Sequence, residues 1–192
     1  MRAAFAALFF VTWVSACSSE SAGTSSSGGP SPTAPEGAVN MEVYATPVQS
    51  CPPGNFHIDI GNTKTMPPAL VVDGWEGATV SCAVIPMSGK FAASGAVKQG
   101  ALDFSFQDVL TDGSSAIGTV SFVDPSAKAS GRYTSPGSMP CVFQFAPGTG
   151  QGVSTGKVWM QFDCSSLVSE VDATKSCSSR YGYVLVDRCA TK

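Results

Sequence analysis

Residues 158–164, Val158-Trp-Met-Gln-Phe-Asp-Cys164, alternate between an apolar set of side chains and a mostly polar set. The apolar set is Val158, Met160, Phe162 and Cys164, and the other set is Trp159, Gln161 and Asp163. Successive side chains of a β-strand point to opposite faces of a sheet, so this period of two predicts a strand with one buried face and one wet face. Strands of that kind are typical of antiparallel sheets.

The same alternation recurs along the rest of the chain, at residues 55–60, 79–84, 102–107, 117–123, 141–146 and 181–189, and more weakly at 91–97. Turn-forming pairs separate these segments: Asp73-Gly74, Ser88-Gly89, Asp112-Gly113, Asp124-Pro125 and Pro136-Gly137. Only residues 166–173 carry a helical signal, enough for a turn or two. The sequence therefore predicts an all-β fold, an antiparallel β-sandwich of about seven to eight strands, with jelly-roll connections as one possibility.

Six cysteines lie within this strand-rich region: Cys51, Cys82, Cys141, Cys164, Cys177 and Cys189. An even number in an exported domain predicts a framework of three disulfides, and six cysteines allow fifteen pairings. We expect the last three to connect the final two strands, although the partners cannot be derived from spacing. The chain has no Cys-x-x-Cys or Cys-x-x-His spacing and a single histidine, His57, so we expect neither a metal site nor a cofactor.

The amino-terminal segment has a different composition. Arg2 is the only charged residue before Glu20, and residues 3–14 are apolar except for Thr12. This run is too short to cross the ~30 Å hydrocarbon core of a bilayer as a helix, so residues 1–16 are predicted to be a signal peptide. Residues 18–37 contain seven Ser, four Gly and three Pro but no aromatic or branched aliphatic side chain, which predicts a disordered linker. One domain of about 155 residues, 38–192, follows it.

The end of the apolar run, Val14-Ser-Ala-Cys17, resembles the lipobox of bacterial lipoproteins. This resemblance implies cleavage before Cys17 and lipidation of that residue. More than one acyl chain is needed there, because a single chain holds a protein at a membrane only marginally. It places the protein in the cell envelope, facing the periplasm or the exterior. Ser18 after the cysteine implies the outer membrane if the cell has two membranes. Residues 156–164, with Cys82 and Cys141 inside earlier strands, also resemble small secreted β-sandwich lipoproteins, which implies a fold and no activity.

Catalytic motifs are weak. Residues 152–156, Gly-Val-Ser-Thr-Gly, match the G-x-S-x-G nucleophile pattern around Ser154, but that motif needs a strand-to-helix turn, and His57 is about a hundred residues away in the chain. Asp73 and Glu76, in residues 73–76, and Asp108 and Asp112, in residues 108–112, could supply oxygens to a calcium site, although Asp is also an ordinary turn residue. The sequence therefore gives no catalytic residue that we would assign.

Exposed aromatic side chains among polar groups can stack on sugars or anchor a protein partner. Trp159, Trp75 and Tyr181 are the candidates here. The formal net charge is −3 and no basic cluster exists, which argues against nucleic-acid binding. We favour a lipid-anchored binding or structural module that recognises a protein or a glycan, rather than an enzyme. The alternative is an envelope hydrolase that cleaves a glycan or ester through scattered carboxylates or the Ser154 loop.

Overall fold

The computed structural model describes residues 31, 33–45, 51, 55–111, 115–123, 131–146 and 148–191. The predicted signal peptide, the lipidation site at Cys17 and most of the predicted linker lie outside these residues. The two turns predicted at Asp112-Gly113 and Asp124-Pro125 also lie outside them. The described residues contain no helix with the length and apolar character needed to cross a membrane.

The fold is all-β, as predicted, and is disulfide-bonded. Its strands are β1 (Glu36–Tyr44), β2 (Phe56–Ile60), β3 (Val71–Val72), β4 (Ala78–Met87), β5 (Lys90–Gln99), β6 (Leu102–Thr111), β7 (Ser115–Val123), β8 (Arg132–Thr134), β9 (Cys141–Gln144), β10 (Gly152–Ser154), β11 (Lys157–Ser169), β12 (Ser176–Asp187) and β13 (Ala190–Thr191). All eight strands expected from alternation are present. The structure has more strands than expected, because β1 and the short strands β3, β8, β10 and β13 gave no alternating signal.

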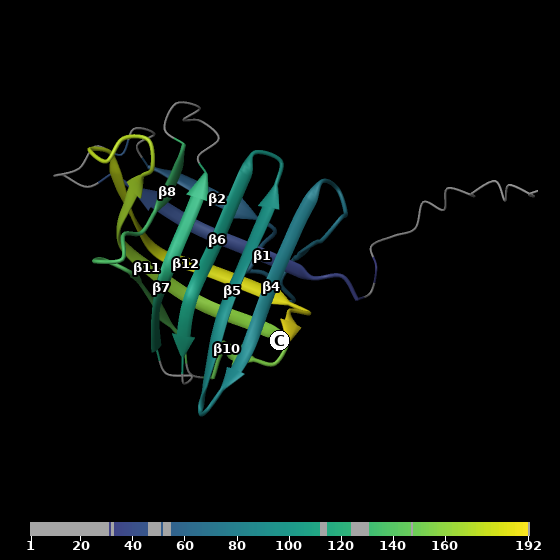
Figure 1. Ribbon diagram of the computed structural model, residues 1–192. Coiled ribbons are helices and arrows are strands. Elements are labelled where there is room, and N and C mark those ends of the chain that lie inside the picture. The colour runs from purple at the N-terminus through teal and green to yellow at the C-terminus, as the bar shows by residue number, and fades with distance from the viewer. Residues whose placement is uncertain are drawn as a thin grey trace, which may run out of the picture.

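The strands form one continuous sheet that folds over itself into a β-sandwich-like pair of layers. Its order is β13-β4-β5-β6-β7-β8-β11-β12-β1-β2, and β9 pairs with both β7 and β11. In Figure 1 the teal strands β4 to β7 cross in front of β1, β12 and β11. Strands β4 to β7 are joined as successive hairpins, so this layer is an up-and-down meander rather than a jelly roll.

The core lies between the two layers and is rich in aromatic rings. Phe104 of β6 and Phe162 of β11 come from opposite layers, and their ring centroids are 5.4 Å apart. Phe143 of β9 lies 5.7 Å from Phe162 by the same measure. The predicted alternation in residues 158–164 is confirmed, since the apolar set is buried and the other set is half-buried. Gly182 of β12 allows this packing, because a Cβ there would lie 2.4 Å from the Phe162 ring.

Strand β1 was not predicted, and the sequence explains why. Residues Ala38 to Met41 of this strand are all buried, because β1 lies between β12 and β2 and is covered on both faces. A strand buried on both faces does not alternate, so period-two counting misses it. The folded domain also begins slightly earlier than the predicted boundary at residue 38, since β1 starts at Glu36.

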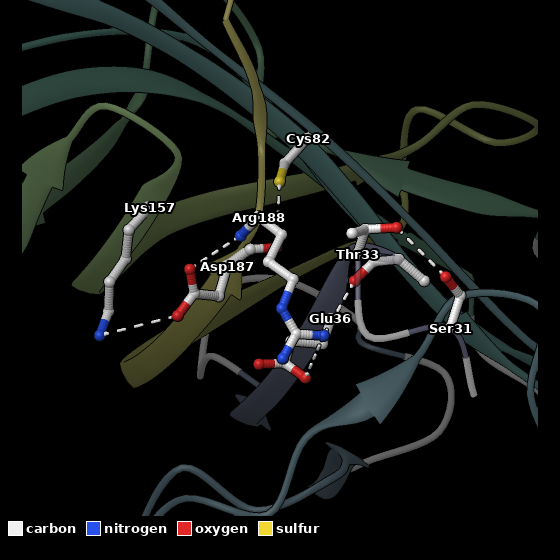
Figure 2. Close-up of polar contacts among 8 residues, drawn as sticks. Ser31, Thr33, Glu36, Cys82, Lys157, Asp187 and Arg188 are labelled. Atoms are coloured by element: carbon white, nitrogen blue, oxygen red, sulfur yellow. Dashed lines mark hydrogen bonds and ion pairs between the residues drawn. The ribbon is translucent and has the colours of Figure 1, made fainter. Parts of the chain in front are cut away.

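The end of the predicted linker is fixed to the domain by Arg188. Arg188 Nη1 lies 3.1 Å from the Glu36 carboxylate and donates to the Ala34 carbonyl oxygen at 3.2 Å, as Figure 2 illustrates. The Pro35 carbonyl oxygen accepts a hydrogen bond from the amide of Asp73 at 2.9 Å. The prediction of a disordered linker as far as residue 37 is therefore wrong for its last residues, because they gain ordered partners from distant strands.

The helical turn predicted at residues 166–173 is also wrong. Strand β11 continues to Ser169, and its Leu167 and Val168 pair with Cys177 and Ser176 of β12. A tight turn follows, in which the Lys175 amide donates to the Asp172 carbonyl oxygen at 2.9 Å. Pairing with β12 and complete burial of Leu167 outweigh the weak local preference for helix.

The six cysteines form the predicted three disulfides, Cys51–Cys177, Cys82–Cys189 and Cys141–Cys164. The expectation that the last three cysteines connect the final two strands is wrong, because each of them pairs with an earlier cysteine. The sheet explains these partners: β13 runs beside β4, and β9 runs beside β11. Each of these two strand pairs brings one early and one late cysteine together.

Candidate binding groove

A groove lies on the outer face of β11 and β12, on the side opposite the core. It encloses about 410 Å³, which is within the usual range for sites that bind small ligands. Its walls are two loops, residues 61–70 and the described residues 145, 146 and 148–151. The lining residues are Thr63, Lys64, Met66, Gly148, Thr149, Gln151, Trp159 and Tyr183.

Trp159 and Tyr183 form the aromatic floor of the groove. Tyr183 pairs with Gln161, so it is the diagonal neighbour of Trp159, which pairs with Leu185. Diagonal neighbours on one face of a sheet lie roughly 7–8 Å apart, close enough for one ligand to contact both rings. Both side chains are half-buried, and both sit on rigid central strands.

Two neighbouring residues lie close to the Trp159 ring. Gly150 passes beside the six-membered ring, where an added Cβ would lie 3.5 Å from a ring carbon. Lys157 Nζ lies 5.7 Å from the ring centroid, a cation–π distance. The indole Nε1 is shielded from solvent and has no hydrogen-bond partner within the described chain.

Asn40 fixes the wall formed by residues 61–70. Its Oδ1 accepts from the Thr63 amide at 2.7 Å and from the Thr63 hydroxyl at 2.6 Å, and its Nδ2 donates to Asp59 Oδ1 at 2.6 Å. The ends of the loop are joined by two backbone hydrogen bonds between Asn62 and Ala69, of 2.7 and 2.9 Å. A buried side chain of β1 thus positions Thr63 and the adjacent Lys64 at the groove.

Internal hydrogen bonds fix the opposite wall as well. The Ala146 amide donates to Gln151 Oε1 at 2.9 Å, and the Thr149 hydroxyl donates to the Ala146 carbonyl oxygen at 2.6 Å. These bonds turn the chain tightly between β9 and β10. Both walls of the groove are therefore built before any ligand arrives.

The structure does not bring the three predicted aromatic residues together. Trp159 is in the groove, whereas Trp75 is 39% exposed in the turn before β4, beside a separate hollow of about 250 Å³. Tyr181 is 62% exposed and lines a third hollow with Arg180 and Asp163. Its positive φ of 54° is supported by a 2.7 Å hydrogen bond from its amide to Asp163 Oδ1.

The sequence did not predict the other groove residues, including Tyr183, Thr63, Lys64 and Gln151. The alternation of Tyr183 with the buried residues Val184 and Val186 could have placed its side chain on the wet face. Thr63 and Lys64 carry no such signal, because the position of their loop depends on Asn40, which is far away in the sequence. Gln151 carries none either, because the hydrogen bonds that hold it lie within its own loop and leave no alternation.

The residues proposed for a hydrolase are far apart. Ser154 pairs with Lys157, in the same cross-strand row as Asp187. The other candidate, His57, lies across from Glu42, in the row of Arg180. Seven residues of β12 separate these rows, which is about 23 Å at ~3.3 Å per residue. The distance is far beyond hydrogen-bond reach, so these two side chains do not form a nucleophile–base pair.

The carboxylates do not converge in the described residues either. No group of three His, Cys, Asp or Glu side chains there is placed to hold a metal ion. Asp103 is paired with Arg132 at 2.8 Å, and Asp73 Oδ1 accepts from the Val80 amide at 2.9 Å. Asp112, named with Asp108 for a calcium site, lies outside the described residues.

No protein-family model matches this chain, and comparisons with curated proteins and with solved structures give no match.

Proposed function

We propose that this chain is a lipid-anchored binding module of a bacterial cell envelope, and that its ligand, a glycan or a protein, occupies the Trp159–Tyr183 groove. The observation that carries the proposal is the half-exposed aromatic floor between two walls that are already hydrogen-bonded. Aromatic side chains provide large apolar contact area, and fixed polar groups around them provide orientation. Such a site needs little ordering on binding, which favours affinity.

Two observations support the envelope location. Three disulfides are typical of proteins in oxidising compartments outside the cytoplasm. The apolar segment before Cys17 has the layout of an export signal. An acyl-modified Cys17 followed by the Ser-, Gly- and Pro-rich segment would hold the domain near a membrane while leaving the groove free to meet its ligand.

The anchor is tested by the Cys17→Ser variant of the full chain. We expect the wild-type protein to incorporate labelled palmitate and to partition into the detergent phase, and the variant to do neither. Ser18→Ala is the matched control, and it should retain the label. A variant that stays membrane-bound would show that Cys17 is not the anchor.

The groove is tested by retention of the detergent-purified protein on its own envelope fractions, with glycans and proteins assayed separately. Trp159→Ala should lower retention at least tenfold, because truncating an aromatic anchor at the centre of a contact typically has effects of that size. Trp75→Ala is the matched control, since it removes a tryptophan outside the groove and should leave retention unchanged. Equal retention of Trp159→Ala and wild type would refute the assignment of the groove.

A further inference from the structure

We infer that the ligand of the groove is an acidic saccharide, with a sugar ring stacked on Trp159 and its carboxylate paired with Lys64. This inference rests on the proposed function and names its ligand class. It is built from three features of the groove: the aromatic floor, the remaining hydrogen-bond capacity of the walls and the local charge.

The floor suits a sugar ring. The face of an aromatic ring carries partial negative charge, and the C–H bonds on one side of a pyranose carry partial positive charge. Trp159 and Tyr183, one diagonal step apart on neighbouring strands, line the groove with aromatic surface. Two rings at this spacing can contact successive parts of one saccharide chain.

The walls keep both donor and acceptor capacity for a ligand. Gln151 lines the groove and its Oε1 accepts from the Ala146 amide, so its side-chain amide nitrogen keeps its capacity to donate. The Thr63 and Thr149 hydroxyls already donate to protein oxygens, so toward a ligand they can only accept. An oxygen-rich ligand with both hydroxyl and carboxylate groups matches this set.

The charge of the groove is positive although that of the chain is negative. Lys64 is the only cation among the described lining residues, and its Nζ has no ion-pair or hydrogen-bond partner in the described chain. No Asp or Glu is among the described lining residues. Lys157, beside the Trp159 ring, already has Asp187 at 4.0 Å. An unpaired ammonium at the rim of an aromatic floor favours a ligand that brings its own carboxylate.

An acidic peptide carries the same charge but fits the floor less well. Extended peptides gain affinity by pairing their backbone with a free sheet edge. The floor here is the face of β11 and β12, which pair with each other on one side and with further strands on the other, so their backbone groups are already used. Hydroxyl-bearing rings can use this face, whereas a peptide backbone cannot.

Calorimetric titration of the detergent-purified full chain tests the inference. The probes are a galacturonic acid trimer, the corresponding neutral galactose trimer and a hexaglutamate peptide. We expect the acidic trimer to bind at least tenfold more tightly than the neutral one. Lys64→Gln should weaken the acidic trimer about tenfold and remove the preference, and Trp159→Ala should weaken both sugars at least tenfold. Lys98→Gln, an exposed lysine of β5, is the matched control and should bind like wild type.

Thermal unfolding of each variant, compared with wild type, establishes that a loss of binding is not a loss of folding. Equal binding of the two sugars, or an acid preference that survives Lys64→Gln, would overturn the inference. So would hexaglutamate binding through Lys64 in place of the sugars, or no binding of any probe. None of these outcomes decides the proposed function, which stands or falls on the Trp159-dependent retention on envelope fractions.

Discussion

The disulfides should stabilise the domain according to the length of chain that each one closes. Cys82–Cys189 closes 107 residues, and Cys141–Cys164 closes 23. Treating each as a loss of unfolded-chain entropy that grows with the logarithm of loop length gives about 4.8 and about 3.4 kcal/mol at 25 °C. Replacing each pair with alanine should therefore lower the free energy of unfolding by amounts that differ by about 1.4 kcal/mol, a tenfold change in the unfolding equilibrium.

Equilibrium unfolding in urea, followed by tryptophan fluorescence, measures both differences. All four cysteines are buried, so the packing lost on substitution by alanine is similar for the two pairs and largely cancels in the comparison. Mass spectrometry after alkylation confirms that the other two disulfides remain closed. If the Cys141–Cys164 pair proves at least as costly to remove as the Cys82–Cys189 pair, native-state packing and not loop closure sets the contribution of these bonds.

Three further changes test the packing, the groove and one turn. Gly182→Ala should lower the free energy of unfolding by about 1–3 kcal/mol in urea, because its Cβ would lie 2.4 Å from the Phe162 ring; an unchanged midpoint would contradict this packing. Asn40→Ala should lower the free energy of unfolding by about 1–3 kcal/mol, because the change leaves buried hydrogen-bond groups of the 61–70 wall without partners. The same variant should weaken ligand retention, and intact retention would argue against a role for that wall. The pKa of Asp172 is lowered, chiefly by hydrogen bonds from Thr174, so the turn should hold above the usual carboxyl pKa and loosen only as the pH falls through the lowered value. An NMR pH titration of the Thr174 amide reports the protonation of Asp172, and a midpoint at the ordinary carboxyl value would contradict the prediction.

Alternation along the chain predicts much of this fold, because a half-buried strand shows its environment in its own residues. Residues 158–164 and 102–107 became strands with the expected buried faces. The same method missed β1, which is buried on both faces, and gave residues 166–173 a helical turn that pairing with β12 overrides. The residues of a segment do not reveal its pairing with a strand that lies far away in the chain.

The candidate site was predictable only in part for the same reason. Trp159 could be predicted because it is an aromatic residue among the polar residues on the wet face of an alternating strand. Lys64 reaches the groove through a loop that is held by Asn40, which is far away in the sequence, and Gln151 through a loop held by its own hydrogen bonds. Neither contact produces an alternating pattern. The disulfide partners were likewise decided by which strands lie side by side, not by which cysteines are nearest in the chain.

The position of β1 has a mechanical consequence. A pull on the amino-terminal segment arrives at Glu36 and acts along the axis of a strand that is hydrogen-bonded to β12 on one side and β2 on the other. Under such a load the bonds of both ladders share the force and must shear together, whereas a strand peeled from its end loses them one at a time. Arg188 forms an ion pair with Glu36 at the start of β1. The next residue, Cys189, connects this point through its disulfide to β4 in the other layer. We therefore expect the domain to resist a load applied along the axis of β1.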